Sequence, residues 1–235
     1  DETQHRVTLS KGYWLGKYEV TQGQWQAVMG SNPSSFKNAG SNAPVEQVSW
    51  DDAQEFCKKL TQKERSAGRL PSGYEYTLPS EAQWEYACRA GTTGEYGGNG
   101  SLGSMGWYGD NSGSTTHPAG QKQANAWGLY DMHGNVWEWC SDWYGTYPSD
   151  AVIDPRKQNP TNNVSIRDGR VTHSGSDGVI RGGSWHYDAS LCRSAYRGSF
   201  GPQGKVFNGW DPRGPLNPSF DYGQIGFRLA LRSVW

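Results

Sequence analysis

The fold of this chain is set by Gly128-Leu-Tyr-Asp-Met-His-Gly-Asn-Val-Trp-Glu-Trp-Cys140. This block combines a glycine turn, two carboxylates and two tryptophans, which is too specific to follow from general requirements of folding. Two shorter blocks come later, Arg181-Gly-Gly-Ser-Trp185 and Gly226-Phe-Arg-Leu-Ala230. Between them, residues 186–224 are rich in Tyr, Phe, Ser, Gly, Asn and Asp, a composition typical of binding surfaces. The pattern indicates a scaffold that carries a binding segment.

Composition limits what this scaffold can be. With 235 residues, 34% of them hydrophobic and 13% aromatic, the chain is expected to fold as one domain over residues 1–235. Its formal net charge is -1 and no Lys/Arg cluster occurs, so we expect no nucleic-acid partner. No apolar run approaches the roughly 20 residues of a membrane-spanning helix. Because the chain begins at Asp1 with no Met, we expect a processed or truncated N-terminus, so that a removed signal or lipid-anchor sequence would not be visible.

Three helix starts carry a capping-box pattern, in which an N-terminal Ser or Thr has a polar partner three residues on. These pairs are Thr21 with Gln24, Ser49 with Asp52, and Ser80 with Gln83. The glycine-bounded segment 12–16 is expected to form a short strand, and the alternating segment 227–232 is expected to form a strand that closes a small sheet. Glycine, proline and small polar residues dominate after Gly91, so most of residues 91–224 should be ordered loop pinned by aromatic rings.

Several blocks together resemble the formylglycine-generating-enzyme (sulfatase-modifying factor) family over nearly the whole chain. Besides the three blocks above, they are 15–21 (LGKYEVT), 44–45 with 48–50 (PV and VSW), 78–86 (LPSEAQWEY) and 192–195 (CRSA). The resemblance implies an α+β, loop-rich C-type lectin-like fold with little regular secondary structure, which agrees with the loop-rich composition.

The enzymes of that family oxidise a substrate cysteine with two cysteines that hold a copper ion. Counting from the Gly-Gly-Ser block, the second cysteine falls on Cys192, whereas the first falls on Tyr187, which offers copper no thiolate. The five histidines show no paired ligand spacing that would replace it. We therefore expect no copper and no formylglycine-generating activity.

The four cysteines are expected to have structural roles. Cys57 and Cys88 lie on apolar helix faces, which favours buried thiols. Cys140 and Cys192 frame one part of the family fold, and the sequence leaves open whether they form a thiol pair or a disulfide. His133, next to a glycine turn, is expected to be a hydrogen-bonded structural histidine.

The turn at 131–138 also fits a metal, because its carboxylates and backbone carbonyls are the hard oxygen ligands that calcium prefers. The resemblance implies a structural calcium ion here. The positions that match the family's ligands are Asp131, Gly134, Val136 and Glu138. The alternative is that the two carboxylates only accept hydrogen bonds from loop amides.

A narrower resemblance is to the variable proteins of diversity-generating retroelements, which use this fold and carry a hypermutated region near the C-terminal end. Mutation of template adenines turns an asparagine codon into Tyr, His, Asp, Ser, Gly, Phe, Leu, Val or Ala, but not into Trp, Lys, Glu, Gln or Met. The expected variable region is 181–232. Its candidate contact residues are His186, Tyr187, Asp188, Leu191, Tyr196, Gly198, Ser199, Phe200, Phe220, Asp221 and Tyr222. Residues expected to be fixed are Trp185, Gln203, Lys205, Trp210 and Gln224.

These residues favour a non-catalytic ligand-binding protein, because short polar and aromatic side chains on a rigid scaffold form a paratope. We expect Tyr187, Tyr196 and Phe200 to be central. The expected ligand is a protein on another cell or a host surface, and the expected location is the bacterial cell surface or the exterior, with a lipid anchor on a missing N-terminal segment as one means of attachment.

Two alternatives remain. The same aromatic residues could fill the loop core of an enzyme of the family with an unidentified oxidative activity. Calcium-dependent sugar binding is disfavoured, because neither Glu-Pro-Asn nor Gln-Pro-Asp occurs in the chain.

Overall fold

Strand β4 (Trp137–Trp143) is the centre of the structure, a computed structural model that describes residues 2–98, 100–157, 163–167, 170–174, 177–201 and 222–233. For 163–167, 170–174 and Tyr222 only the backbone is described. β4 pairs with β8 (Gly178–Arg181) and with β10 (Ile225–Gly226), and β8 pairs with β9 (Gly198–Phe200). The resulting sheet has the order β10-β4-β8-β9, and only the β10–β4 pair is parallel.

A second sheet joins the two ends of the chain. β11 (Ala230–Ser233) lies between β2 (Trp14–Leu15) and β3 (Tyr74–Thr77) and is antiparallel to both. The strands expected at 12–16 and near the C-terminus are therefore confirmed. The last strand begins three residues later than expected, because the carbonyls of Phe227 and Leu229 accept hydrogen bonds from Val20 and Gly16 in an irregular ladder.

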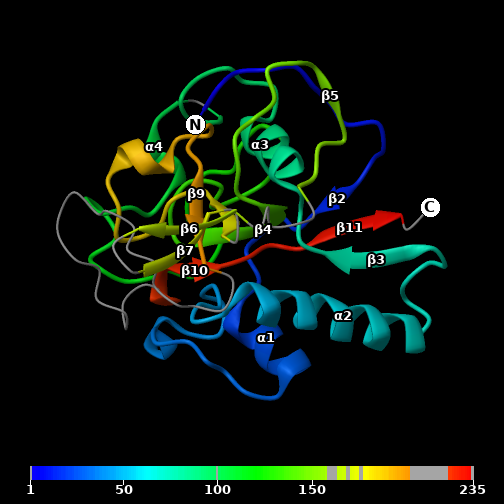
Figure 1. Ribbon diagram of the computed structural model, residues 1–235. Coiled ribbons are helices and arrows are strands. Elements are labelled where there is room, and N and C mark those ends of the chain that lie inside the picture. The colour runs from blue at the N-terminus through cyan, green and yellow to red at the C-terminus, as the bar shows by residue number, and fades with distance from the viewer. Residues whose placement is uncertain are drawn as a thin grey trace.

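Helices α1 (Gln22–Met29) and α2 (Trp50–Ser66) lie on one side of the central strands and α3 (Glu81–Arg89) on the other (Figure 1). All three expected capping boxes are present, with both hydrogen bonds formed at each. Each box satisfies amides that the first helical turn leaves unpaired, which fixes where the helix begins. None of the described helices is long and apolar enough to cross a membrane.

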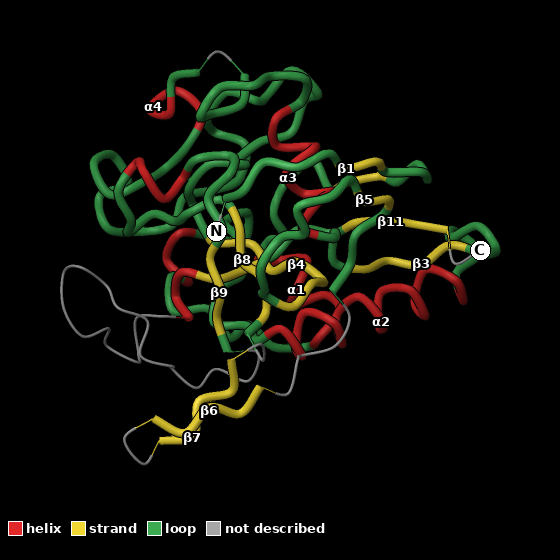
Figure 2. Tube along the Cα trace, turned by 45° about the horizontal axis from the view of Figure 1, so that its top comes forward, coloured by secondary structure: helices red, strands yellow, loops and turns green. Residues whose placement is uncertain are grey.

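The shorter elements lie in the loops between these units. A parallel pair joins β1 (Val7–Thr8) to β5 (Val152–Ile153), and β6 (Asn163–Arg167) pairs with β7 (Arg170–Ser174) in a hairpin that points away from the body (Figure 2). The remaining helical pieces are η1 (Lys37–Ala39), α4 (Leu102–Met105), η2 (Ala189–Cys192) and η3 (Tyr222–Gln224).

Two apolar clusters cover the two faces of β4. Trp137 and Trp139 belong to the cluster of α1 and α2, where the rings of Trp25 and Phe56 stack with centroids 5.3 Å apart. Cys140 belongs to the cluster of α3. Because both faces of β4 are buried, the strand lacks the alternation of apolar and polar residues that marks a half-buried strand. The expectation that residues 91–224 are mostly loop is confirmed for the described part of this range, but the strands of the central sheet within it, β4, β8 and β9, were not predicted.

Candidate binding surface

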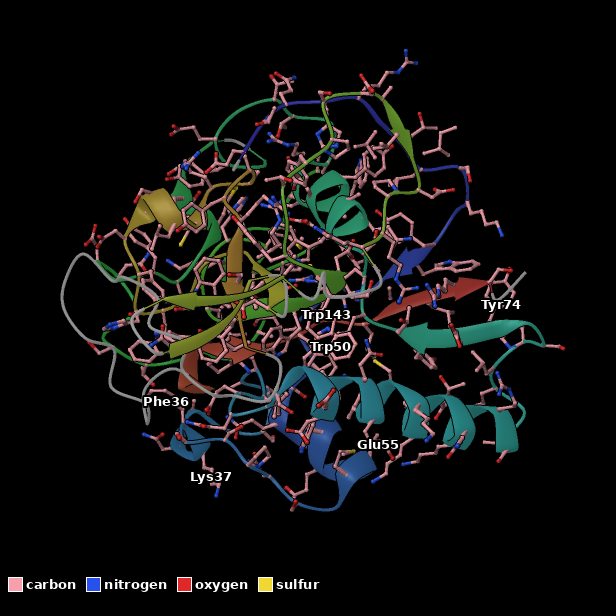
Figure 3. All side chains as sticks on the ribbon, viewed as in Figure 1. Phe36, Lys37, Trp50, Glu55, Tyr74 and Trp143 are labelled. Atoms are coloured by element: carbon pink, nitrogen blue, oxygen red, sulfur yellow. The ribbon has the colours of Figure 1, made fainter. Side chains whose placement is uncertain are left out.

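Residues 185–200 form a strap over the β4 tryptophans, and its buried residues hold it in place. The Trp185 indole is 1% exposed and donates a 2.8 Å hydrogen bond to the carbonyl of Gly223. The ring of Phe36, which precedes η1, meets it edge-on at 5.1 Å (labelled in Figure 3). Trp185 therefore ties the start of the strap to Gly223, in the C-terminal part of the expected variable region. Gln224, also expected to be fixed, is buried and accepts from the Ser184 hydroxyl.

Two buried arginines anchor the middle of the strap. The Arg197 guanidinium makes a two-pronged hydrogen bond to the Glu81 carboxylate at 2.6 and 2.9 Å. Arg181, fully buried, donates to the carbonyls of Ser194 and Tyr196 and pairs with Glu85. Such fork-shaped pairs fix geometry as well as adding energy. The anchoring role of these two arginines was not predicted from the sequence. Its signal was the presence of charged residues within blocks that are otherwise buried.

The candidate contact residues with described side chains are more exposed than the anchors between them. Asp188 is exposed, and the others are half-buried: His186, Tyr187, Leu191, Tyr196, Gly198, Ser199 and Phe200. By contrast, Cys192 and Ser194 are completely buried. Phe220, Asp221, Gln203, Lys205 and Trp210 lie outside the described residues, as does the side chain of Tyr222. The strap thus alternates between anchoring and outward-facing positions. Gly198 is an exception, because a Cβ there would lie 2.7 Å from Ile180 Cγ1 and would point into the sheet.

The three aromatic residues expected to be central rest on the core. Tyr187 and Tyr196 contact the Trp137 ring at centroid distances of 5.8 and 5.9 Å, and Phe200 contacts Trp139 at 6.3 Å. Each ring is half-buried, so one part of it packs on the core while the rest reaches the surface. The expected alternative, that these rings fill the loop core, holds for that buried part. Rings held in this way lose little conformational entropy when they meet a ligand.

All four cysteines are buried free thiols. Burial raises the pKa of Cys192 to about 12, and it raises the pKa of Cys140 well above the usual value. Such thiols stay protonated at neutral pH, which suits structural roles. Cys57 and Cys88 are buried as expected, and Cys140 and Cys192 are free thiols in the structure.

His133 is a structural histidine, as expected. Its Nδ1 lies 2.7 Å from the carbonyl of Cys192, and its Nε2 accepts a 2.9 Å hydrogen bond from the Gly97 amide. Nδ1 therefore carries the proton and the ring is neutral, and burial lowers its pKa to about 4. Through this ring the turn at Gly134 is tied to Cys192 of the strap.

The turn expected to bind calcium lies beside a buried carboxylate cluster, formed by Glu19, Asp131 and Glu138 around Arg228. Glu138 accepts two hydrogen bonds from Arg228 and one from the Trp84 indole at 2.7 Å. Asp131 Oδ2 accepts from the Gly120 amide, whereas Asp131 Oδ1 is buried without a hydrogen-bond partner among the described residues. Burial, reinforced by Asp131 and Glu138, raises the pKa of Glu19 well above its usual value.

Only part of this arrangement fits the expected metal site. Asp131 offers a buried oxygen to a cation, but Glu138 is already neutralised by Arg228. In the described part of the chain, no group of three or more His, Cys, Asp or Glu side chains is arranged to hold a metal ion. A calcium ion would rely on Asp131 and the carbonyls of Gly134 and Val136, and Glu138 would have to leave Arg228 to join them. Calcium stays a prediction.

The sequence and the fold are similar to those of known proteins. The sequence profile of the sulfatase-modifying factor enzyme 1-like domain matches residues 1–208. The chain belongs to this family. Its relatives include "Chaperone protein LppX" of Paenibacillus barcinonensis, 32% identical over 84% of this chain and 78% of that protein. They also include the formylglycine-generating enzyme of Streptomyces coelicolor, 30% identical over 80% of this chain. The chain spans about half the length of that enzyme, 52%.

Solved structures of family type confirm the fold. "Treponema denticola variable protein 1" superposes with a TM-score of 0.74 and 33% identity, covering 97% of this chain and 87% of that one. PvdO from Pseudomonas aeruginosa superposes with a TM-score of 0.65 and 25% identity, covering 96% and 82%. The expected α+β, loop-rich C-type lectin-like fold of formylglycine-generating type is therefore confirmed, and so is the resemblance to a variable protein.

Proposed function

We propose that this family member is a non-catalytic binding protein whose strap, residues 185–200, presents a diversified contact surface. The observation that carries the proposal is the alternation along the strap. Candidate contact residues are exposed or half-buried, whereas the anchors Trp185, Cys192, Ser194 and Arg197 are at most 7% exposed. A surface whose outward side chains can change while its anchors stay fixed is what a sequence-variable binder requires. The similarity to the Treponema denticola variable protein supports the same function.

The chemistry of the strap favours binding over catalysis. Counted from the Gly-Gly-Ser block, the family's first catalytic cysteine falls on Tyr187, whose ring packs on Trp137. The second falls on Cys192, which is fully buried and whose raised pKa keeps it protonated. By this count, a copper site with two thiolates would lack one of its ligands. The ligand we propose is a protein on another cell or host surface, and we propose display on the bacterial cell surface, which surface labelling of intact producing cells tests.

A pair of libraries tests the proposed binding surface. In the first, the seven candidate contact residues with described side chains are randomised, and Gly198 is kept because a Cβ there would lie 2.7 Å from Ile180 Cγ1. In the matched library, seven anchor and core positions of the same blocks are randomised instead: Arg181, Ser184, Trp185, Cys192, Ser194, Arg197 and Gln224. We expect the first library to yield folded binders to several unrelated target proteins and the second to yield mostly unfolded chains. Equal loss of folding in both libraries would contradict the proposal.

The family's enzymatic alternative is tested directly. Wild-type protein and a Tyr187→Cys variant are incubated with copper and a cysteine-containing peptide, and loss of the peptide thiol is followed by mass spectrometry. We expect no copper-dependent oxidation by the wild type. Turnover by the wild type would instead make this chain an oxidative enzyme of the family.

A further inference from the structure

Arg156, just after β5, differs from the buried arginines that build the fold. Arg181, Arg197 and Arg228 each meet a carboxylate. The Arg156 Nε is buried, yet within the described residues it has no hydrogen-bond acceptor. The Arg181 Nε also lacks an acceptor in the described part of the chain, but it still lies 3.4 Å from the Glu81 carboxylate. A buried donor without an acceptor costs roughly 1–3 kcal/mol, more when the group is charged. Such a group points to a partner that the protein itself does not supply.

A cavity of about 380 Å³ lies against this guanidinium. Its volume is at the lower end of the range typical of small-molecule sites. Arg232 of β11 and Lys11 line it together with Arg156, and its acidic lining residues are Glu75 and Asp154. Both carboxylates are engaged: Glu75 accepts from Arg232 at 2.9 Å, and Asp154 accepts from the Ser10 amide at 2.8 Å.

The charges around the cavity therefore leave an excess of positive charge at Arg156. Burial lowers the pKa of Arg156, and the nearby positive charge of Arg232 lowers it further. The negative charges of Asp142 and Glu75 raise the pKa of Arg156, but neither carboxylate accepts a hydrogen bond from its Nε. Two guanidinium groups facing one cavity match the oxygen geometry of phosphate and sulfate, which arginine binds through paired N–H groups.

We propose that the cavity between Arg156 and Arg232 binds a dianionic tetrahedral oxyanion, the phosphate or sulfate group of a small molecule. The site lies outside the strap and is independent of the function proposed for it. Its ligand would offer oxygens to the Arg156 Nε and to the side of the Arg232 guanidinium that Glu75 does not occupy. Ser80 also lines the cavity, and its hydroxyl is engaged there as the cap of α3, accepting from the Gln83 amide.

Calorimetric titration tests this site with two probes, inorganic sulfate and glycerol 3-phosphate, at constant ionic strength. We expect the wild type to bind both, and Arg156→Gln to weaken both at least about tenfold, because a charge-assisted hydrogen bond is lost. Arg156→Lys keeps the charge but loses the fork, so its binding should be intermediate. The control Arg69→Gln removes an exposed arginine that pairs with Glu64 and is not among the residues that line the cavity, so it should leave binding unchanged.

Two further arms identify the ligand chemistry. Lowering the pH from about 8 to about 5 protonates the phosphate monoester, whose second pKa is about 6, and should weaken its binding but not that of sulfate. If the wild-type protein sediments with phosphatidic acid vesicles and Arg156→Gln does not, the oxyanion belongs to a lipid. If the wild type does not sediment with the vesicles, the oxyanion belongs to a soluble molecule. Circular dichroism establishes whether each variant is folded. If Arg156→Gln does not fold, the binding measured with Arg156→Lys decides the test. No binding by the wild type, or equal binding by the folded Arg156 variants, overturns the proposal.

Discussion

The guanidinium of Arg228 and the carboxylate of Glu138 form a completely buried pair, with Nε and Nη2 each 2.6 Å from a carboxylate oxygen. Arg228 also donates to the carbonyls of Gly16 and Tyr130, both at 3.0 Å. The pair thereby joins the C-terminal segment, the central strand and the segment before α1. Because neither charge reaches water, loss of one partner leaves the other uncompensated.

We predict that Arg228→Met lowers the free energy of unfolding by about 3–5 kcal/mol, since the Glu138 charge would remain buried without a partner. The double variant Arg228→Met/Glu138→Leu should recover much of that loss. Urea unfolding at neutral pH measures both. Arg69→Met, which removes only an exposed pair, is the control and should not change stability measurably. A single variant as stable as the double variant would contradict this assignment.

The Asp131 carboxyl predicts an unusual pH dependence. Burial raises its pKa from 3.8 to about 6. The folded state therefore binds a proton more tightly than the unfolded state, and stability falls as the pH rises from about 4 to about 6. Asp131→Asn removes this effect and tolerates the left-handed backbone at φ 54°. In EDTA we predict that Asp131→Asn is more stable than the wild type near pH 7.5, by about 1–3 kcal/mol, and not below pH 4.

Asp154→Asn is the control of opposite sign. The Ser10 hydroxyl and amide lower the pKa of Asp154, so this substitution should destabilise the protein at neutral pH and have no effect at low pH. Unfolding curves at several pH values measure both variants. If Asp131→Asn destabilises the protein at pH 7.5 in EDTA, the ionised Asp131 carboxylate stabilises the folded state, which would contradict this prediction.

Calcium is predicted to act through the same residue. If it binds the turn at 131–138, it stabilises the ionised Asp131, and thermal stability should rise with calcium concentration by mass action. We predict that calcium raises the Tm of the wild type and leaves the Tm of Asp131→Asn unchanged, with magnesium as the control ion. A wild-type Tm that does not change with calcium concentration would contradict calcium binding at this turn.

The strap predicts a contrast between neighbouring positions. Trp185→Ala should cost about 3–5 kcal/mol, because it empties a buried site and removes the hydrogen bond to Gly223. Asp188→Asn should change the free energy of unfolding by about 0.5 kcal/mol or less, because this side chain is exposed. Chemical denaturation measures both. A large loss of stability at Asp188 would place it among the anchors.

Much of this architecture could be predicted from the sequence where the signal is local. The capping boxes at Thr21, Ser49 and Ser80 depend on residues three apart, and all three formed. Strand β4 could not be predicted, because both of its faces are buried and no periodicity remains. The pairing of Arg197 with Glu81 spans 116 residues and depends on the tertiary fold. Arg156 is marked by what it lacks, which only a structure reveals.

The candidate contact residues follow the same division. The composition of the strap and the codon filter indicated which side chains vary, but neither distinguishes a ring on the surface from a ring in the core. The structure shows that the rings of Tyr187, Tyr196 and Phe200 belong partly to the surface and partly to the core. Each packs on a core tryptophan and remains half-buried. The expected binding role therefore needs a test at the level of the gene.

The most direct test is to sequence the genomic neighbourhood of this gene. A diversified binding surface requires a near-copy of the segment that encodes residues 181–232, beside a reverse transcriptase gene, with differences confined to template adenines at the codons of the candidate contact residues. The codons of Trp185, Cys192 and Arg197 should be identical in the two copies. A neighbourhood without such a copy, or one whose differences fall on the anchors, would contradict a diversified binding surface.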